Sequence, residues 1–101
     1  MPELPVACTL SPEALVSRRQ GLLAELLRHA ETHEELTSGH RWSFAATDDV
    51  FAMILRMVEA ERRCCRFLRF QIVVEPDGGP VSVELTGPPG TREFLAALFE
   101  S

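Results

Sequence analysis

Polar and apolar residues alternate in four segments of the chain, and this pattern predicts four β-strands. The segments are residues 4–10, 40–46, 68–75 and 81–86. Apolar side chains at every second position are typical of strands that bury one face of a sheet and leave the other face polar. We therefore expect a sheet of about four strands with helices packed on one face.

Apolar residues at helical spacing predict three helices between and after these strands. Ser11 precedes a proline and a glutamate, which favours a helix that begins there and ends at about Ala30 or His33. Thr47 is a suitable N-cap for a second helix, and Thr91 for a short third one. The second helix has an expected buried stripe made of Val50, Phe51, Ile54, Leu55, Val58 and Cys65.

The polar stretch 31–39 carries no clear periodicity, and we expect it to be a loop. Residues 76–80 read Pro-Asp-Gly-Gly-Pro, which predicts a hairpin turn. The predicted element order is β-α-β-α-β-β-α, which indicates an α+β fold of two layers. At 101 residues the chain is the size of one domain, covering residues 1–101.

Charge and composition narrow the partners that we expect. Ten basic residues, all arginine, stand against fifteen acidic ones, so the formal net charge is −5. This balance argues against nucleic acid and anionic membranes as partners. No apolar run is long enough to span a membrane, and the first residues lack the features of a secretory signal, so we expect a cytoplasmic protein. Three cysteines, two of them adjacent, do not suggest a disulfide framework.

The strongest chemical signal lies where the second helix is expected to end. Cys64 and Cys65 are adjacent there, and Glu61 precedes them by about one helical turn. Thiolates prefer soft ions such as Cu(I), Zn(II), Hg(II) or trivalent arsenic, so the pair is a candidate metal or metalloid site. Cys8, on the apolar side of the predicted first strand, is a candidate third ligand. We see no signature of an organic cofactor.

Arginines surround the cysteine pair and admit two interpretations. They can lower the pKa of a nearby thiol or hold an anion, and Arg62 and Arg66 are the candidates for a supporting role. Alternatively they are solvated or paired with Glu59 and Glu61, which is the commoner situation. The set comprises Arg62, Arg63, Arg66 and Arg69.

Two histidines form a second candidate site. His29 and His33 are four residues apart, a spacing that places two imidazoles on one helical face and can bind zinc. Histidines near the C-terminus of a helix also interact favourably with its dipole, and this structural role is the more frequent one. No further ligands are evident nearby.

The motif Glu-Arg-x-Cys-Cys-x-Phe-x-x-Phe at residues 61–70, together with Cys-Thr-Leu at residues 8–10, resembles a family of small, largely uncharacterised bacterial proteins with an ExxCCxFxxF motif. The similarity extends over nearly the whole chain. The resemblance implies an association with heavy-metal resistance, particularly to mercury. It implies site roles for Cys8, Glu61, Cys64 and Cys65. Members often carry proline after the cysteine pair, where this chain has Arg66.

Three functional hypotheses follow. The first is a binding protein that sequesters or transfers a soft metal or metalloid ion through Cys64 and Cys65, with Cys8 as third ligand. The second is a cysteine-dependent enzyme for redox chemistry or carbon–metal bond cleavage, with Glu61 as proton donor. The third is a structural or interaction module, such as a homodimer joined through an open sheet edge, in which the cysteines only pack. We favour a binding protein over an enzyme.

Overall fold

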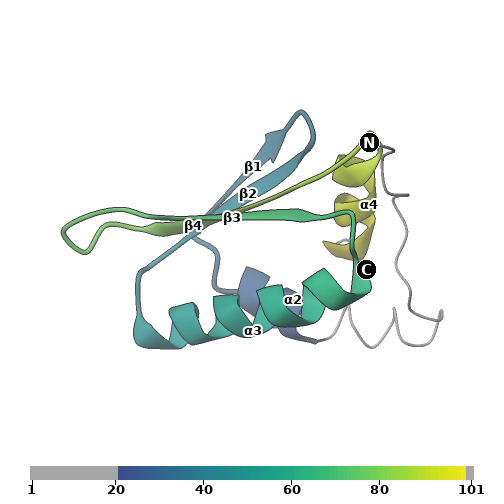
Figure 1. The fold of residues 1–101 in the computed structure, drawn as a ribbon. Coiled ribbons are helices and arrows are strands. Elements are labelled where there is room, and N and C mark those ends of the chain that lie inside the picture. The colour runs from purple at the N-terminus through teal and green to yellow at the C-terminus, as the bar shows by residue number, and fades with distance from the viewer. Residues whose placement is uncertain (1–20, 100–101) are drawn as a thin grey trace.

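The computed structural model describes residues 21–99 as seven helices and strands around one sheet (Figure 1). The predicted strand at residues 4–10, with Cys8, and the start of the first predicted helix at Ser11 lie outside the described residues. The elements in chain order are α2 (Leu22–Leu27), β1 (Thr32–Leu36), β2 (Gly39–Phe44), α3 (Asp48–Cys64), β3 (Arg69–Val74), β4 (Val81–Thr86) and α4 (Thr91–Phe99).

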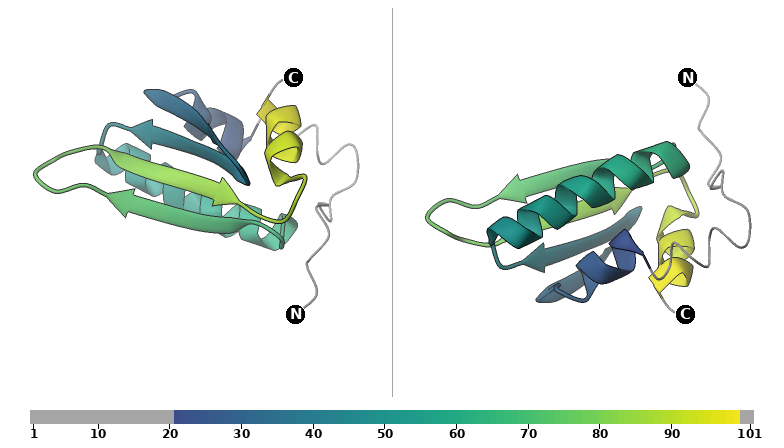
Figure 2. Two further views of the ribbon diagram at one scale, coloured as in Figure 1. Left: turned by 90° about the horizontal axis from the view of Figure 1, so that it is seen from above. Right: turned by 90° about the horizontal axis from the view of Figure 1, so that it is seen from below.

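The four strands form one antiparallel sheet in the order β1-β2-β4-β3. Helices α2 and α3 lie against one face of this sheet, and no helix among residues 21–99 covers the other face (Figure 2). Helix α4 stands at one end of the sheet, beside β2 (Figure 1). The predicted α+β class and the four-stranded sheet are thus confirmed. None of the described helices is long and apolar enough to cross a membrane.

The stretch 31–39 is not a loop, and the prediction made for it was wrong. It contains strand β1 and a tight turn at residues 37–38, and β1 pairs along its whole length with β2, from Thr32 opposite Ser43 to Leu36 opposite Gly39. β1 is an edge strand whose side chains, apart from Leu36, are exposed. Because no face of β1 is buried, its sequence shows no alternation of polar and apolar residues.

Helix α2 is shorter than the sequence pattern predicted. It ends at Leu27, and the next turn is tightened by hydrogen bonds from the backbone N–H of His29 to the carbonyl of Leu26 (2.9 Å) and from Ala30 to Leu27 (3.2 Å). Bonds between residues three apart are common where an α-helix ends. The chain can then enter β1, so His33 belongs to a strand and not to the end of a helix.

Helix α3 begins where the sequence predicted. The hydroxyl of Thr47 accepts a hydrogen bond from the N–H of Val50 (3.2 Å), and two aspartates occupy the first turn. The buried residues of α3 recur at helical spacing. They are Val50, Ile54, Met57 and Glu61. Leu55, which was predicted in the buried stripe, is 64% exposed. It lies about 100° around the helix from Ile54, which turns it away from the sheet.

The core lies between the helices and the covered face of the sheet. Alternate residues of the two central strands supply its upper layer, with exposures of 3% or less: Trp42, Phe44, Val81, Val83 and Leu85. The predicted turn at residues 76–80 is confirmed, with positive φ angles at Asp77 and Gly78. It reverses the chain between β3 and β4 and places β3 at the second edge of the sheet.

Candidate thiol site at the end of helix α3

The two adjacent cysteines lie where α3 stops and the chain turns toward β3. Cys64 is the last helical residue, and Cys65 is the C-cap with φ −117° and ψ 79°. The N–H of Cys65 still donates to the carbonyl of Glu61 at 2.7 Å, whereas the carbonyl of Cys65 accepts from the N–H of Leu68 at 3.1 Å. The backbone therefore holds Cys65 within one helical turn of Glu61, as the sequence predicted.

Cys64, Cys65 and Glu61 differ in how far they are buried, and this difference limits the role that each can take. The side chain of Cys65 is completely buried, Cys64 is half-buried, and Glu61 is only 1% exposed. Glu61 occupies the sheet-facing side of α3 together with Ile54 and Met57. A carboxyl group in the core is unusual, because removing it from water is costly unless the protein compensates it. The end of α3 thus combines two thiols and a buried acid within five residues.

The loop after β4 packs closely beside this turn. A Cβ atom at Gly87 would lie 2.6 Å from the hydroxyl of Thr91 and 3.1 Å from the carbonyl oxygen of Phe67, so a side chain at this position would force its neighbours to shift. The rings of Phe67 and Phe94 meet edge to face with centroids 5.2 Å apart. These contacts fix the start of β3 against α4 and limit how far the cysteine turn can move.

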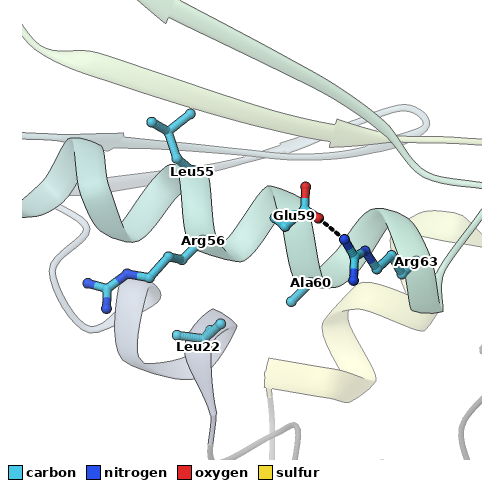
Figure 3. A pocket seen from close by; sticks show the side chains of 6 residues that line it. All are labelled: Leu22, Leu55, Arg56, Glu59, Ala60 and Arg63. Carbon is cyan, nitrogen blue, oxygen red and sulfur yellow. Dashed lines mark hydrogen bonds and ion pairs between the residues drawn. The ribbon is translucent and has the colours of Figure 1, made fainter.

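Two of the candidate arginines point away from the buried acid. Arg62 donates to the carboxylate of Glu59 at 3.2 Å, and Arg63 forms a second ion pair with the same carboxylate (Figure 3). The hydrogen bond and the charge of Arg62, with the charge of Arg63, hold the pKa of Glu59 below its ordinary value. Arg66 is exposed. Arg62 and Arg63 therefore form the surface ion pairs that were the alternative interpretation.

A shallow pocket lies on the outer surface of α2 and α3, away from the sheet (Figure 3). Its lining is Leu22, Leu55, Arg56, Glu59, Ala60 and Arg63. None of the candidate site residues Cys64, Cys65 and Glu61 lines it. It does not provide an approach to the thiols.

The structure also brings together three rings that the sequence did not connect. His33, His40 and Trp42 are stacked, with ring centroids 5.0 to 5.5 Å apart. Nε2 of His33 lies 2.8 Å from Nδ1 of His40, and Nε2 of His40 lies 3.0 Å from the carbonyl oxygen of Arg92. Because the carbonyl can only accept, Nε2 of His40 carries hydrogen and donates in this contact. The cluster ties β1 and β2 to α4.

The pairing of His29 with His33 as one helical face was wrong. His29 follows α2, whereas His33 lies in β1 and stacks on His40 and Trp42. The true pair, His33 with His40, is formed by neighbouring strands, so its seven-residue separation carries no helical signal. Only a prediction of the hairpin at residues 32–44 would have indicated that His33 and His40 lie together.

Among residues 21–99, no group of three or more histidine, cysteine, aspartate or glutamate side chains is arranged to hold a metal ion. The described part of the proposed ligand set is therefore the cysteine pair, and Cys8 lies outside the described residues. No protein-family description, curated protein or solved structure matches this chain.

Proposed function

We propose that this protein binds a soft metal or metalloid ion through Cys64 and Cys65, with Cys8 as the third ligand, and sequesters or transfers it. The observation that supports this proposal is the placement of two adjacent thiols at the turn where α3 ends, with Cys64 half-buried and Cys65 completely buried. Thiolates bind Hg(II), Cu(I), Zn(II) and trivalent arsenic in preference to hard cations.

The difference in burial between the cysteines suggests an order of binding. Cys64 is half-buried and accessible to an incoming ion, whereas Cys65 is completely buried. An ion would first meet Cys64 and then exchange a ligand for the thiolate of Cys65. A site with one accessible and one buried thiolate suits transfer, because a partner thiol can attack the ion from the exposed side.

Native mass spectrometry of the reduced full chain tests the proposal with Zn(II), Cu(I), Hg(II) and arsenite in turn. We expect one ion per chain for at least one of them, and loss of that ion in Cys64→Ala and in Cys65→Ala. Cys8→Ala tests the third ligand and should weaken binding without abolishing it. No adduct with any ion, or adducts unchanged in the double Cys64→Ala, Cys65→Ala variant, would refute the proposal.

Folding must be measured on the same variants, because Cys65 is a core residue. Removing its sulfur should lower the free energy of unfolding by about 1–2 kcal/mol, whereas Cys64→Ala should cost less because Cys64 is half-buried. Cys64→Ala is therefore the cleaner test of ion binding. Arg63→Gln is a matched control on the same helical turn, because Arg63 is paired with Glu59 on the surface and should leave ion binding unchanged.

A cysteine-dependent enzyme is the second candidate, and the burial of Glu61 favours it. A plain thiolate site needs no buried acid, whereas a carboxyl group held within one helical turn of the thiols can act as a proton donor. In carbon–metal bond cleavage, the thiolates would take the metal, and the bonding electron pair would remain on carbon and accept the proton of Glu61.

A single variant, Glu61→Gln, distinguishes ion binding from the enzymatic function. With an arylmercury compound as probe, Glu61→Gln should retain mercury binding in both cases. Only the enzyme would release the arene at a measurable rate, and Glu61→Gln would abolish that release. Arene release by the wild-type chain no faster than by small thiols alone would exclude this candidate.

A further inference from the structure

Exposed apolar side chains gather along strand β3. Ile72 and Val73 are each 39% exposed and Val74 is 57% exposed, although all three are large hydrophobic residues. Ile72 and Val74 lie on the covered face of the sheet, where their neighbours on β4 are the fully buried Val83 and Val81. They are exposed because nothing in the described chain pairs with the outer side of β3. We call residues 69–75 the β3 edge.

The β3 edge lacks the features that keep sheet edges apart. Between Arg69 and Glu75 it has no charged residue and no proline. The opposite edge, β1, is protected, because Glu34 and Glu35 occupy its centre and would repel a second copy of the same strand. The two edges of this sheet are therefore not equivalent, and only β3 is suited to pairing with another strand.

Helix α3 extends the apolar surface below β3. Leu55, at 64% the most exposed large hydrophobic side chain of the described residues, points away from Leu22 of α2 in Figure 3, whereas Arg56 and Ala60 lie on the α2 side. Figure 2 shows that α2 lies under β1 and β2, and α3 lies nearer β3. Leu55 is therefore on the side of α3 that faces the β3 edge of the molecule.

The sequence of the β3 edge is complementary to itself when it is reversed. We propose that a second copy of this chain pairs with it, antiparallel, about a two-fold axis at Ile72. This register places Arg69 opposite the partner's Glu75 and Phe70 opposite the partner's Val74, and Ile72 meets its own copy. Two opposite-charge pairs then flank an apolar centre. The two sheets join into one of eight strands.

The same axis brings the α3 helices together with favourable polarity. Because the axis is perpendicular to the sheet, both α3 helices lie on the same side of the joined sheet and run in opposite directions. The first turn of α3 carries Asp48 and Asp49, and its last turn carries Arg62 and Arg63. Each acidic end thus lies toward the basic end of the partner's helix, and Leu55 faces the region between them.

Sedimentation velocity on the full chain over a range of concentrations tests this interface. We expect a monomer–dimer equilibrium in the wild type. Ile72→Lys should raise the dissociation constant at least about a hundredfold, because two lysines would meet at the axis. Glu35→Lys, the matched control on the β1 edge, should leave the dissociation constant unchanged. Far-UV circular dichroism establishes that both variants are folded.

Charge reversal tests the register. Arg69→Glu and Glu75→Arg should each raise the dissociation constant roughly tenfold, because each creates two like-charge pairs, and the double variant should restore wild-type association. A chain that remains monomeric at all concentrations overturns the proposal. So does a dimer that Ile72→Lys leaves intact, or one in which the double reversal fails to restore what the single reversals lose. None of these outcomes depends on the cysteines.

Discussion

Gly39→Ala is the substitution for which the structure gives the sharpest expectation. Gly39 opens β2, opposite Leu36 on β1 and Thr86 on β4, so it lies between two strands. A Cβ atom at this position would lie 1.8 Å from the carbonyl oxygen of Leu85 and 2.9 Å from Cα of Thr86. Both are backbone atoms, so no side-chain rotation can relieve the overlap.

The loss of stability expected for Gly39→Ala follows from the distance of 1.8 Å to the carbonyl oxygen of Leu85. Real Cβ contacts essentially never fall below 3.0 Å, so the backbones of β2 and β4 must separate by about 1.2 Å at this end of the sheet. Forced overpacking of this kind costs about 1–3 kcal/mol. Weakening the hydrogen bonds of the terminal pair adds about 0.5–1.5 kcal/mol. We expect Gly39→Ala to lower the free energy of unfolding by about 2–4 kcal/mol.

Urea unfolding followed by tryptophan fluorescence measures this change. Trp42 is the sole tryptophan, lies three residues from Gly39 and is 3% exposed, so its emission reports the β2 region. Gly78→Ala is the control: Gly78 has φ +72° but no atom within 4 Å of its Cβ position, so it carries backbone strain of about 1–2 kcal/mol and no collision. If Gly39→Ala costs no more than Gly78→Ala, the close approach of β2 and β4 is wrong.

Three further expectations concern α3 and the core. Thr47→Ala should cost about 1 kcal/mol in unfolding free energy, because the hydroxyl that accepts from the N–H of Val50 is lost; calorimetry measures it, and Thr47→Ser should retain most of the stability. Phe44→Ala should cost about 3–5 kcal/mol, because Phe44 is fully buried between sheet and helices; a loss below 1 kcal/mol in urea unfolding would contradict that position. The pKa of Glu59 is lowered by Arg62, so the ion pair stabilises the fold above the ordinary glutamate pKa and is lost as pH falls through the lower folded value; an NMR titration of the Arg62→Gln variant should show that pKa rising toward its ordinary value.

The elements with a buried face were predictable from the sequence. β2, β4 and α3 each place apolar residues against the core at the period of their secondary structure, and all three begin and end close to the predicted positions. β1 was missed because it is held by backbone pairing with β2 and by polar contacts such as the ion pair of Arg41 with Glu34. Interactions of that kind depend on which strands become neighbours, and hydrophobic periodicity does not record it.

In the candidate site, too, the relations within one helical turn were predictable from the sequence and those that depend on tertiary packing were not. The relation of Glu61 to Cys65 is local, fixed by one turn of α3, and the sequence predicted it. The burial of Glu61 and the difference between Cys64 and Cys65 could not be predicted, because they arise from tertiary packing around the end of the helix, which the local sequence does not record. His33 and His40 escaped notice for the same reason, since only the hairpin brings them together.

The position of the two-fold axis at Ile72 determines how far apart the two cysteine pairs of a dimer lie. Arg69 is three residues from Ile72, so at about 3.4 Å per residue the two Arg69 residues of a dimer would lie about 20 Å apart along the paired strands. Cys65 precedes Arg69, and the two thiol pairs therefore lie at opposite ends of the interface, too far apart for one ion to contact both. Native mass spectrometry should show one ion per chain in both the dimer and the monomeric Ile72→Lys variant, with equal affinity. A single ion bound per dimer would require thiols from both copies at one place, and would refute an axis at Ile72.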